Sequence, residues 1–218
     1  MTTPYTVYCA GALFNHKDLI GNAILASYIE TVSQGQYTCV LPQDFAQVTQ
    51  GAVDIRNQAL TQVMACDLAL FNFDGSDLDS GTVVEFMFAK CLDIPAVILR
   101  SDFRASGDQQ EDGDAWNLMC SFYPRTRVVQ CHAMVWYQQA RQAGGRLQDV
   151  MQRLYTRIAS VLIEHLETVR HESPLTKGSL DVERLYRWAL RFPGSGLEEH
   201  AAFAVDTILA QKRRKGLV

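Results

Sequence analysis

The sequence predicts an α/β protein, with a doubly wound, five-stranded parallel sheet of the flavodoxin/Rossmann-like kind and a C-terminal helical extension. The first observation is a regular pitch, because short apolar runs begin near residues 6, 38, 67, 96 and 127, at spacings of 29 to 32 residues. This pitch indicates a repeated βα unit with right-handed crossovers. The second observation is that runs such as residues 68–73 are apolar at almost every position, as strands covered on both faces are.

Length and composition place the chain among ordinary folded proteins. Its 218 residues are enough for one domain with an appendage, and we expect residues 1–170 to form the main domain and residues 171–218 the helical extension. The hydrophobic fraction of 48% and the charged fraction of 20% are typical of a globular fold. A formal net charge of −4 argues against nucleic acid or an anionic membrane as a partner.

Several classes of protein are disfavoured by what the chain lacks. No apolar run approaches the ~20 residues that cross a bilayer, and the first residues do not have the pattern of a signal peptide. The six cysteines include no Cys-x-x-Cys pair and lie mostly in apolar segments, which is typical of reduced thiols in a cytosolic protein. The five histidines form no close cluster with other ligands, so we expect no metal site.

The strands of the main domain are bounded by residues that break regular structure. Gly11 ends the first run, Pro42 follows the second, and Pro95 precedes the fourth. We expect strands at residues 6–10, 37–41, 68–73, 96–99 and 126–131. Apolar residues at helical spacing predict helices at about residues 15–31, 53–65, 83–92 and 147–166. The polar crossover at residues 100–123 has the composition of a binding loop or lid.

The C-terminal extension is predicted to be helical and docked. A helix is expected at residues 179–192, and a last helix at about residues 195–211, with Ser195 and Glu198 as a capping box. We expect the apolar residues of the first of these helices to be buried against the main domain or a partner subunit: Leu185, Trp188 and Phe192. The basic residues 212–215 would complement the C-terminal end of the last helix.

The loop after the third strand carries the most reactive groups. Asp79 and Glu85 flank Ser80, Gly81 and Thr82, where a strand passes through a polar loop into a helix. Open α/β sheets bind ligands at such carboxyl ends of strands. The simpler alternative is that Asp79 and Ser80 only cap the helix. The chain has neither a P-loop, nor a dinucleotide fingerprint, nor a Gly-x-Ser-x-Gly elbow, so carboxylates must supply the chemistry.

Four separated segments, taken together, resemble the nucleoside 2-deoxyribosyltransferase family. They are residues 7–14, Asp67 with its strand, residues 79–85, and residues 99–104 leading to Asn117-Leu118-Met119. The resemblance covers roughly residues 5–131, and each segment stands at the carboxyl end of a predicted strand or beside one.

The resemblance implies a role for each residue that matches the family pattern. Glu85 looks like the nucleophile that carries the sugar, Asp79 like the acid that holds sugar hydroxyls and assists proton transfer, and Tyr8 like the tyrosine that orients the nucleophile. Asn117 resembles the asparagine that a neighbouring subunit contributes to the sugar's 5′-hydroxyl. The remaining substrate-binding residues by the same resemblance are Gly11, Phe14, Asp44, Ser80, Gly81, Thr82 and Met119.

The activity implied is the exchange of the base of a nucleoside through a covalent intermediate, without metal or organic cofactor. The implied partners are a nucleoside, a free nucleobase and further copies of the chain, in a homodimer or larger homo-oligomer. A carboxylate beside the anomeric carbon suits this chemistry, because breaking an N-glycosidic bond builds positive charge on the sugar.

Two departures from the family pattern keep other functions open. Ala12 stands where relatives often carry proline, and Ala59 stands where they often carry an acidic or amide residue for the base. One alternative is an N-glycosidase of nucleosides or nucleotides, which uses the same nucleophile with water as acceptor. The other is a non-catalytic nucleotide-binding module.

Overall fold

A computed structural model describes residues 3–45, 51–102, 114–176 and 178–218. Its centre is a five-stranded sheet in the order β2-β1-β3-β4-β5, in which every neighbouring pair is parallel. The strands are β1 (Tyr5–Ala10), β2 (Tyr37–Val40), β3 (Leu68–Asn72), β4 (Ala96–Arg100) and β5 (Thr126–Gln130). The predicted fold class is confirmed, and each predicted strand agrees with the structure to within one residue at either end.

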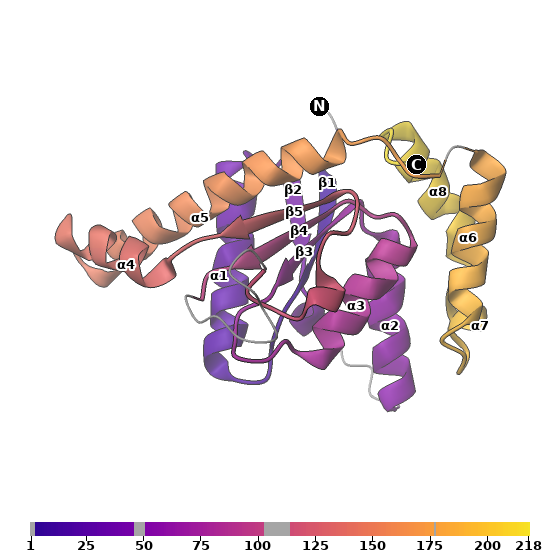
Figure 1. Ribbon diagram of the computed structural model, residues 1–218, viewed down its shortest axis with the longest axis horizontal. Helices are drawn as coiled ribbons and strands as arrows, with labels where there is room; N and C mark the ends of the chain where they lie inside the picture. The colour runs from indigo at the N-terminus through magenta and orange to yellow at the C-terminus, as the bar shows by residue number, and fades with distance from the viewer. Residues whose placement is uncertain (1–2, 46–50, 103–113, 177) are drawn as a thin grey trace.

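Helices cover both faces of the sheet (Figure 1). The face that carries Val7 and Leu70 packs against α1 (His16–Val32) and α5 (Leu147–Arg170). The opposite face, with Tyr8 and Phe71, packs against α2 (Ala52–Ala65) and α3 (Ser80–Cys91). Successive side chains of a strand point to opposite faces, so strands that are apolar throughout supply both cores at once.

The strand order reverses between β1 and β3. The chain moves from β1 outward to β2, and then returns to the other side of β1 to form β3. In doubly wound sheets the ligand site lies at such a reversal, outside the carboxyl ends of the strands. Gly11 follows β1 here, and a Cβ added to it would lie 3.1 Å from the Cβ of Asn72 at the end of β3. The two strand ends are therefore packed as closely as glycine permits.

Helix α4 (Ala133–Gln142) was not predicted from the sequence. Residues 134–137 are four consecutive apolar or aromatic residues, so they trace no single helical face. Two short 3₁₀ helices, η1 (Pro42–Asp44) and η2 (Leu118–Cys120), follow β2 and precede β5 respectively. Part of the polar crossover at residues 100–123 lies outside the described residues.

The predicted last helix is divided in two. The C-terminal elements are α6 (Ser179–Arg191), α7 (Leu197–Ala201), η3 (Ala202–Ala204) and α8 (Val205–Arg214). The expected capping box is wrong, because Ser195 has φ = 53° and the cap of α7 is Gly196 in the left-handed region. Asn57 on α2 donates to the carbonyl of Ser195 at 2.9 Å, which holds this turn on the main domain.

The extension docks on α2 and α3 through a different face from the one expected. Val182, Tyr186 and Leu190 are buried in the same core cluster as the inner residues of α2 and α3. Trp188 and Phe192 are 53% and 54% exposed, and their rings stack on each other at 5.1 Å. The expected burial of these two residues against the main domain is therefore wrong, whereas their burial against a partner subunit stays a prediction. The buried set follows the spacing i, i+4, i+8, which is one helical stripe.

The basic C-terminus is bound to the first strands. Lys212 is buried and donates a hydrogen bond to the carbonyl of Cys66. Lys215 forms an ion pair with Asp67 at 2.5 Å and donates to the carbonyl of Pro4 at 2.7 Å. The N- and C-termini accordingly lie near each other in Figure 1. The two lysines lie at the C-terminal end of α8, and their contacts hold the end of the chain against the start of the sheet.

Candidate active site

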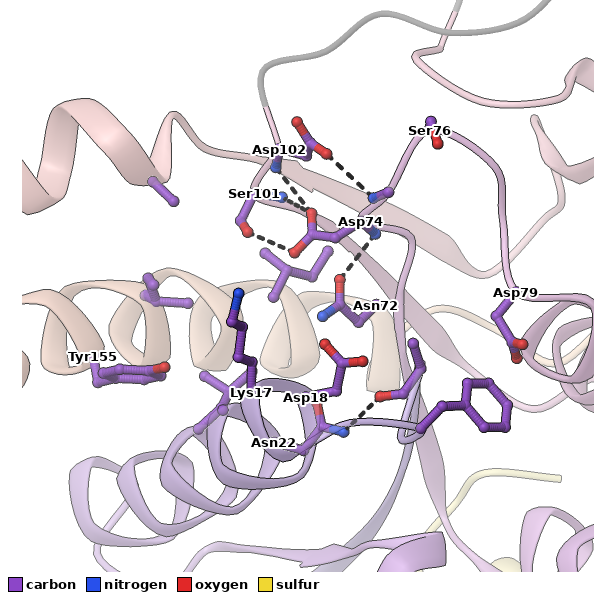
Figure 2. A pocket seen from close by; sticks show the side chains of 18 of the residues that line it. Lys17, Asp18, Asn22, Asn72, Asp74, Ser76, Asp79, Ser101, Asp102 and Tyr155 are labelled. Atoms are coloured by element: carbon purple, nitrogen blue, oxygen red, sulfur yellow. Dashed lines mark hydrogen bonds between the residues drawn. The ribbon is translucent and has the colours of Figure 1, made fainter.

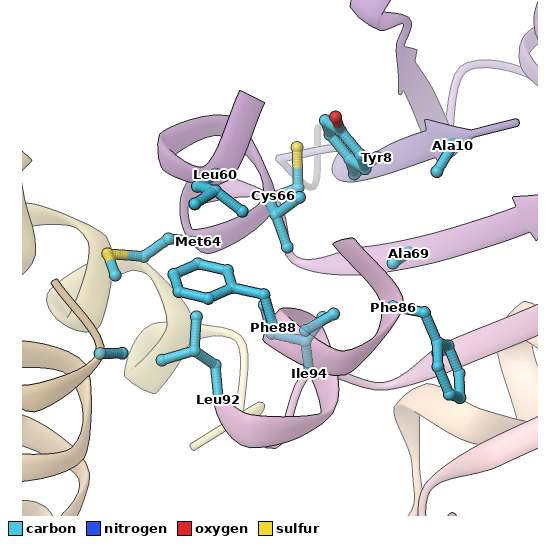
Figure 3. Packing of buried hydrophobic residues seen from close by; sticks show 14 of the residues in the cluster. Tyr8, Ala10, Leu60, Met64, Cys66, Ala69, Phe86, Phe88, Leu92 and Ile94 are labelled. Carbon is cyan, nitrogen blue, oxygen red and sulfur yellow. The ribbon is translucent and has the colours of Figure 1, made fainter. Parts of the chain in front are cut away.

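Tyr8 and Glu85 form a hydrogen-bonded pair between the sheet and α3. Tyr8 is fully buried on β1, within the apolar cluster drawn in Figure 3, and its hydroxyl donates to Glu85 Oε1 at 2.7 Å. Glu85 lies in the second turn of α3, one residue before the buried Phe86. The helix therefore directs a carboxylate at a tyrosine whose ring the core holds rigidly.

The surroundings of Tyr8 and Glu85 raise the pKa of both side chains. The pKa of Glu85 is raised from 4.5 to about 7. Burial is the main cause of the rise, the hydrogen bond from Tyr8 opposes it, and the nearby charge of Asp79 adds to it. Burial and the charge of Glu85 raise the pKa of Tyr8 above its ordinary value, so its hydroxyl keeps its proton. Glu85 consequently titrates close to neutral pH while Tyr8 remains a donor.

Asp79 caps α3 and lies close enough to influence Glu85. Its Oδ2 accepts hydrogen bonds from the backbone N–H of Thr82 at 2.7 Å and from the Thr82 hydroxyl at 2.8 Å. Gly81 lies directly over this carboxylate, because a Cβ added to it would be 3.2 Å from Asp79 Oδ2. Capping is therefore one function of Asp79, as the simpler alternative required. No donor among the described residues forms a hydrogen bond with Asp79 Oδ1.

The loop that carries Asp79 is attached to the end of β4. Asp74 Oδ1 accepts from the backbone N–H groups of Ser101 at 2.6 Å and Asp102 at 2.9 Å, and its Oδ2 accepts from the Ser101 hydroxyl at 2.6 Å. The buried Arg100 donates to the carbonyl of Gly75 at 2.8 Å. We refer to Asp74, Gly75, Arg100, Ser101 and Asp102 as the loop latch.

A cleft of about 680 Å³ opens beside Asp79 (Figure 2). Phe14 and Asp79, two of the residues expected in the site, line it, whereas Tyr8 and Glu85 do not. The cleft therefore adjoins the reactive pair and does not enclose it. The other lining residues are Ala12, Lys17, Asp18, Gly21, Asn22, Leu25, Asn72, Asp74, Gly75, Ser76, Asp77, Leu99, Ser101, Asp102, Ala133, Leu154, Tyr155 and Ile158.

The remaining expected residues lie in α3, η1 and η2, outside the Tyr8–Glu85 pair. Ser80 is exposed in the first turn of α3, beside Asp79, and Asp44 is exposed in η1. Asn117 caps η2, with its Oδ1 accepting from the N–H of Met119 at 2.9 Å, and Met119 is 75% exposed. Within the described part of the chain, no recorded hydrogen bond joins Asp44, Asn117 or Met119 to Glu85.

Several cleft residues were not identified from the sequence. Asn72 is the last residue of β3 and Ser101 follows β4, so a survey of polar residues at and just after the end of each predicted strand would have found them. Lys17 and Asn22 lie on α1, and Tyr155 lies on α5. The sequence around Tyr155 shows only the apolar face of a helix, which gave no sign of a cleft.

Two further observations concern the described residues alone. No three His, Cys, Asp or Glu side chains among them gather in a way that could hold a metal ion. None of the described helices is both long enough and apolar enough to span a membrane.

Comparison with known proteins finds one matching family. The family model described as "Nucleoside 2-deoxyribosyltransferase" matches residues 7–119, which are just over half of the chain and include Tyr8, Asp79, Glu85 and Asn117. Among curated proteins there is no match.

Solved structures provide further similarities. A conserved protein from Enterococcus faecalis V583 is 23% identical, with a TM-score of 0.49 over 71% of this chain and 99% of that chain. A 2-deoxyribosyltransferase from Leishmania mexicana is 25% identical, with a TM-score of 0.44 over 55% of this chain and 87% of that one. A 2-deoxyribosyltransferase from Bacillus psychrosaccharolyticus is 17% identical, with a TM-score of 0.39 over 53% and 79%.

Proposed function

The chain belongs to the nucleoside 2-deoxyribosyltransferase family, and we propose that it exchanges the base of a 2′-deoxynucleoside through a covalent sugar intermediate on Glu85. The observation that carries the proposal is the Tyr8–Glu85 hydrogen bond of 2.7 Å, which orients a half-buried carboxylate beside Asp79. A nucleophile that is held in one orientation, and has lost part of its hydration, is prepared to attack the anomeric carbon.

The first step forms a bond between a Glu85 oxygen and the anomeric carbon. The N-glycosidic bond breaks at the same carbon, and its electron pair goes to the base nitrogen, which takes up a proton. Asp79 is the group proposed to assist that proton transfer, because it lies at the start of the helix that carries Glu85. Positive charge on the sugar in the transition state is stabilised by the neighbouring carboxylates.

The second step reverses the first with a new base. A nitrogen of the incoming base attacks the anomeric carbon, the bond to Glu85 breaks with its electrons returning to the carboxylate, and the attacking nitrogen loses its proton. Two displacements at one carbon retain the configuration of the sugar. Tyr8 donates to the same carboxylate throughout, so it orients Glu85 and stabilises the charge that returns to it.

We propose that a second copy of the chain completes each site with Asn117 and Met119. The support is that η2 and the residues after it present an apolar surface to solvent: Leu118, Met119 and Phe122 are 58%, 75% and 81% exposed. On α3, Val84 and Met87 are also exposed. Exposed apolar groups of this extent are typical of surfaces that bind another protein. A two-fold dimer would let each copy serve the other.

The reaction can be tested with a deoxynucleoside in the presence and absence of a second free base. The expected result is a new nucleoside only when the second base is present. Release of the base alone, at the same rate under both conditions, would identify a hydrolase that uses water as acceptor. No change in the nucleoside would exclude both activities for that substrate, so purine and pyrimidine deoxynucleosides are each tested.

A pair of matched variants assigns the reaction to Glu85. Glu85→Gln keeps the shape of the side chain and an acceptor for the Tyr8 hydroxyl, but it removes the nucleophile. We expect turnover to fall more than about 100-fold, because several kcal/mol of transition-state stabilisation are lost. Glu164→Gln, an exposed position on α5, is the control and should retain wild-type turnover.

We propose that the reaction takes place in the cytosol, which the six free thiols support.

A further inference from the structure

The C-terminal extension lies beside α2 (Figure 1) and holds this helix near its amino end. Arg56 on α2 donates hydrogen bonds to the carbonyl oxygens of Pro193 at 3.2 Å and Gly194 at 3.0 Å. The neighbouring Asn57 donates to the next carbonyl, that of Ser195, at 2.9 Å. Three consecutive carbonyls of the turn between α6 and α7 therefore accept from two consecutive side chains of α2. We refer to these five residues as the α2 clasp.

The turn of the α2 clasp has a strained backbone. Gly194, Ser195 and Gly196 have φ angles of 63°, 53° and 77°, so three successive residues lie in the left-handed region. Serine is disfavoured there because its Cβ crowds the following carbonyl oxygen. The hydrogen bonds from Arg56 and Asn57 offset that cost. Asn57 is 3% exposed, and its Oδ1 accepts from Arg56 at 2.8 Å, so the polar groups of the clasp satisfy one another.

The extension also holds the carboxyl end of α2. Cys66 is the C-cap of α2, and its carbonyl accepts a hydrogen bond from the buried Lys212 of α8. The next residue, Asp67, forms an ion pair with Lys215. Helix α2 is thus fixed at both ends by residues that lie beyond the segment 7–119 of the family match. The family pattern therefore assigns no role to these contacts.

Helix α2 supplies part of the core cluster that surrounds Tyr8. Leu60, Met64 and Cys66 are buried in the same cluster as Tyr8 (Figure 3). Because Tyr8 is fully buried, the position of its ring depends on the side chains packed around it. Its hydroxyl donates to Glu85 at 2.7 Å, and a hydrogen bond weakens steeply when its angle departs from linearity. A shift of α2 therefore disturbs the contact that orients Glu85.

We propose that the C-terminal extension is a positioning element of the reaction, in which Arg56 and Lys212 hold α2 so that Tyr8 stays hydrogen-bonded to Glu85. The expected effect on turnover rests on the proposed function, whereas the effect on the Tyr8–Glu85 pair does not. A misplacement of about 1 Å can cost ~10²-fold in rate, so a modest loosening of α2 is enough to be measured. This role is distinct from stabilising the fold, because it is expressed within the folded protein.

Arg56→Met tests the α2 clasp. Methionine keeps the apolar stem of the side chain and removes the guanidinium that binds the turn, and the position is partly exposed, so the variant is expected to fold. We expect kcat/KM to fall about tenfold at a temperature where the variant is folded. Arg187→Met is the matched control, because Arg187 pairs with Glu183 and Asp206 inside the extension. It should leave kcat/KM unchanged.

The pKa of Glu85 gives a second readout, which needs no turnover. It is measured by carbon-13 NMR of labelled glutamate, with Glu85→Gln identifying the signal. This pKa is about 7, because burial raises it and the hydrogen bond from Tyr8 opposes the rise. Tyr8→Phe should therefore raise it further, and Arg56→Met should raise it part of the way. In the Tyr8→Phe background, Arg56→Met should have no further effect on the pKa or on kcat/KM.

Lys212→Met removes the contact at the other end of α2. It should change kcat/KM and the pKa of Glu85 in the same direction as Arg56→Met. Lys212 is fully buried, so Arg56→Met decides the outcome when the Lys212 variant does not fold. Urea denaturation of each variant establishes that the comparison is made between folded proteins.

The two readouts separate this inference from the proposed function. If Arg56→Met raises the pKa of Glu85 but the wild-type chain turns over no nucleoside, the proposed function fails and the positioning of the pair stands. If the wild-type chain exchanges bases, but Arg56→Met leaves the pKa of Glu85 unchanged or lowers it, the proposed function stands and this inference is overturned. Effects of Arg56→Met and Tyr8→Phe on kcat/KM that multiply independently would also overturn it, because they would reflect a structural role alone.

Discussion

Glu85 gives up part of its hydration in order to reach the Tyr8 hydroxyl. The folded state therefore favours the protonated carboxyl, and the pKa of Glu85 is about 7 instead of 4.5. The stability that this protonation contributes is fully present below pH 4.5 and is lost as the pH rises through about 7. The partly buried Glu85 carboxylate, once ionised, therefore lowers the free energy of unfolding at neutral pH.

The first prediction follows from that linkage. The amide that Glu85→Gln introduces does not titrate. The free energy of unfolding of this variant, minus that of the wild type, should therefore increase by about 3 kcal/mol from pH 4.5 to pH 8. Urea denaturation at several pH values measures the gain. Glu164→Gln should show no such trend, because that carboxylate is exposed. A constant difference between Glu85→Gln and the wild type would show that Glu85 is not destabilised by burial.

The second prediction separates the two functions of Asp79. Asparagine is also a good N-cap, so Asp79→Asn should change the free energy of unfolding by less than about 1 kcal/mol. It should nevertheless slow cleavage of the N-glycosidic bond by ~10²–10⁴-fold, with the largest loss for bases that leave poorly. Rates are compared for a series of leaving bases. Asp54→Asn, in the first turn of α2, is the control. A variant as fast as the wild type with every base would leave Asp79 as a cap alone.

At the scale of elements, the loop latch determines where Asp79 lies. Two strands end side by side, and the loops that follow them are joined by the contacts of Asp74 and Arg100. The third prediction is that Asp74→Asn lowers the free energy of unfolding by about 1–3 kcal/mol, since three donors share the lost carboxylate. The measurement is chemical denaturation of both variants. Asp77→Asn lies in the same loop, and the Asp77 side chain makes no hydrogen bond to a described residue, so this variant should not lower the free energy of unfolding. Equal effects of the two variants would contradict the role of the loop latch.

The elements that could be predicted from the sequence are those whose own residues determine them. Strands β3 and β4 are apolar except for their last residues, Asn72 and Arg100. The side chain of Asn15, which precedes α1, caps the helix by accepting from the backbone N–H groups of Lys17 and Asp18. The turn at Ser195 that precedes α7 could not be predicted, because Asn57 on a distant helix holds it. A contact between residues far apart in sequence leaves no local pattern.

The candidate site was predictable to a similar extent. Asp79 and Glu85 stand in one loop and the helix that follows it, so the sequence brings them together, and the fold adds Tyr8 from an adjacent strand. The cleft could not be predicted, because residues of α1 and α5 line it together with residues at the ends of β3 and β4. Likewise, α6 has two apolar stripes, and only the packing against α2 and α3 decides that Tyr186 is buried and Trp188 exposed.

At the scale of the whole molecule, we propose that residues 171–218 are an extension that stabilises the main domain. The fourth prediction is that truncation after residue 172 uncovers the outer face of α2 and α3, where Leu60 and Leu92 are now buried with α6 to α8. The truncated chain should bind a hydrophobic dye, lose solubility or change its oligomeric state.

A milder variant covers the case in which the truncated chain does not fold. Tyr186→Ala in the full chain removes a buried side chain from the same contact and should lower the free energy of unfolding by about 3 kcal/mol. Trp188→Ala, at an exposed position of the same helix, is the control and should cost less than 1 kcal/mol. A truncated protein as stable, soluble and associated as the full chain would refute the stabilising role.

The fifth prediction concerns the shared site. Homodimers of Glu85→Ala and of Asn117→Ala should both be impaired. When the two are unfolded and refolded together, about half of the dimers are hybrids, and each hybrid has one pocket with both residues intact, so about a quarter of all pockets should recover. Native mass spectrometry confirms that hybrids have formed. Hybrids without recovered activity would mean that Asn117 does not act across the interface.

The ion pair between Lys215 and Asp67, which joins residues 148 positions apart, has a consequence for the order of events during synthesis. The last strand is complete once Gln130 has been added, but α2 and α3 are covered only when α8 has also emerged, up to Leu209. At about 5–20 residues per second, that interval lasts on the order of 4–16 s. During that interval the apolar surface of α2 and α3 is open to water, and until Arg170 has been added the face of the sheet that α5 covers is open as well. Before α6 to α8 cover it, this apolar surface is open to contact with the ribosome surface or with a chaperone.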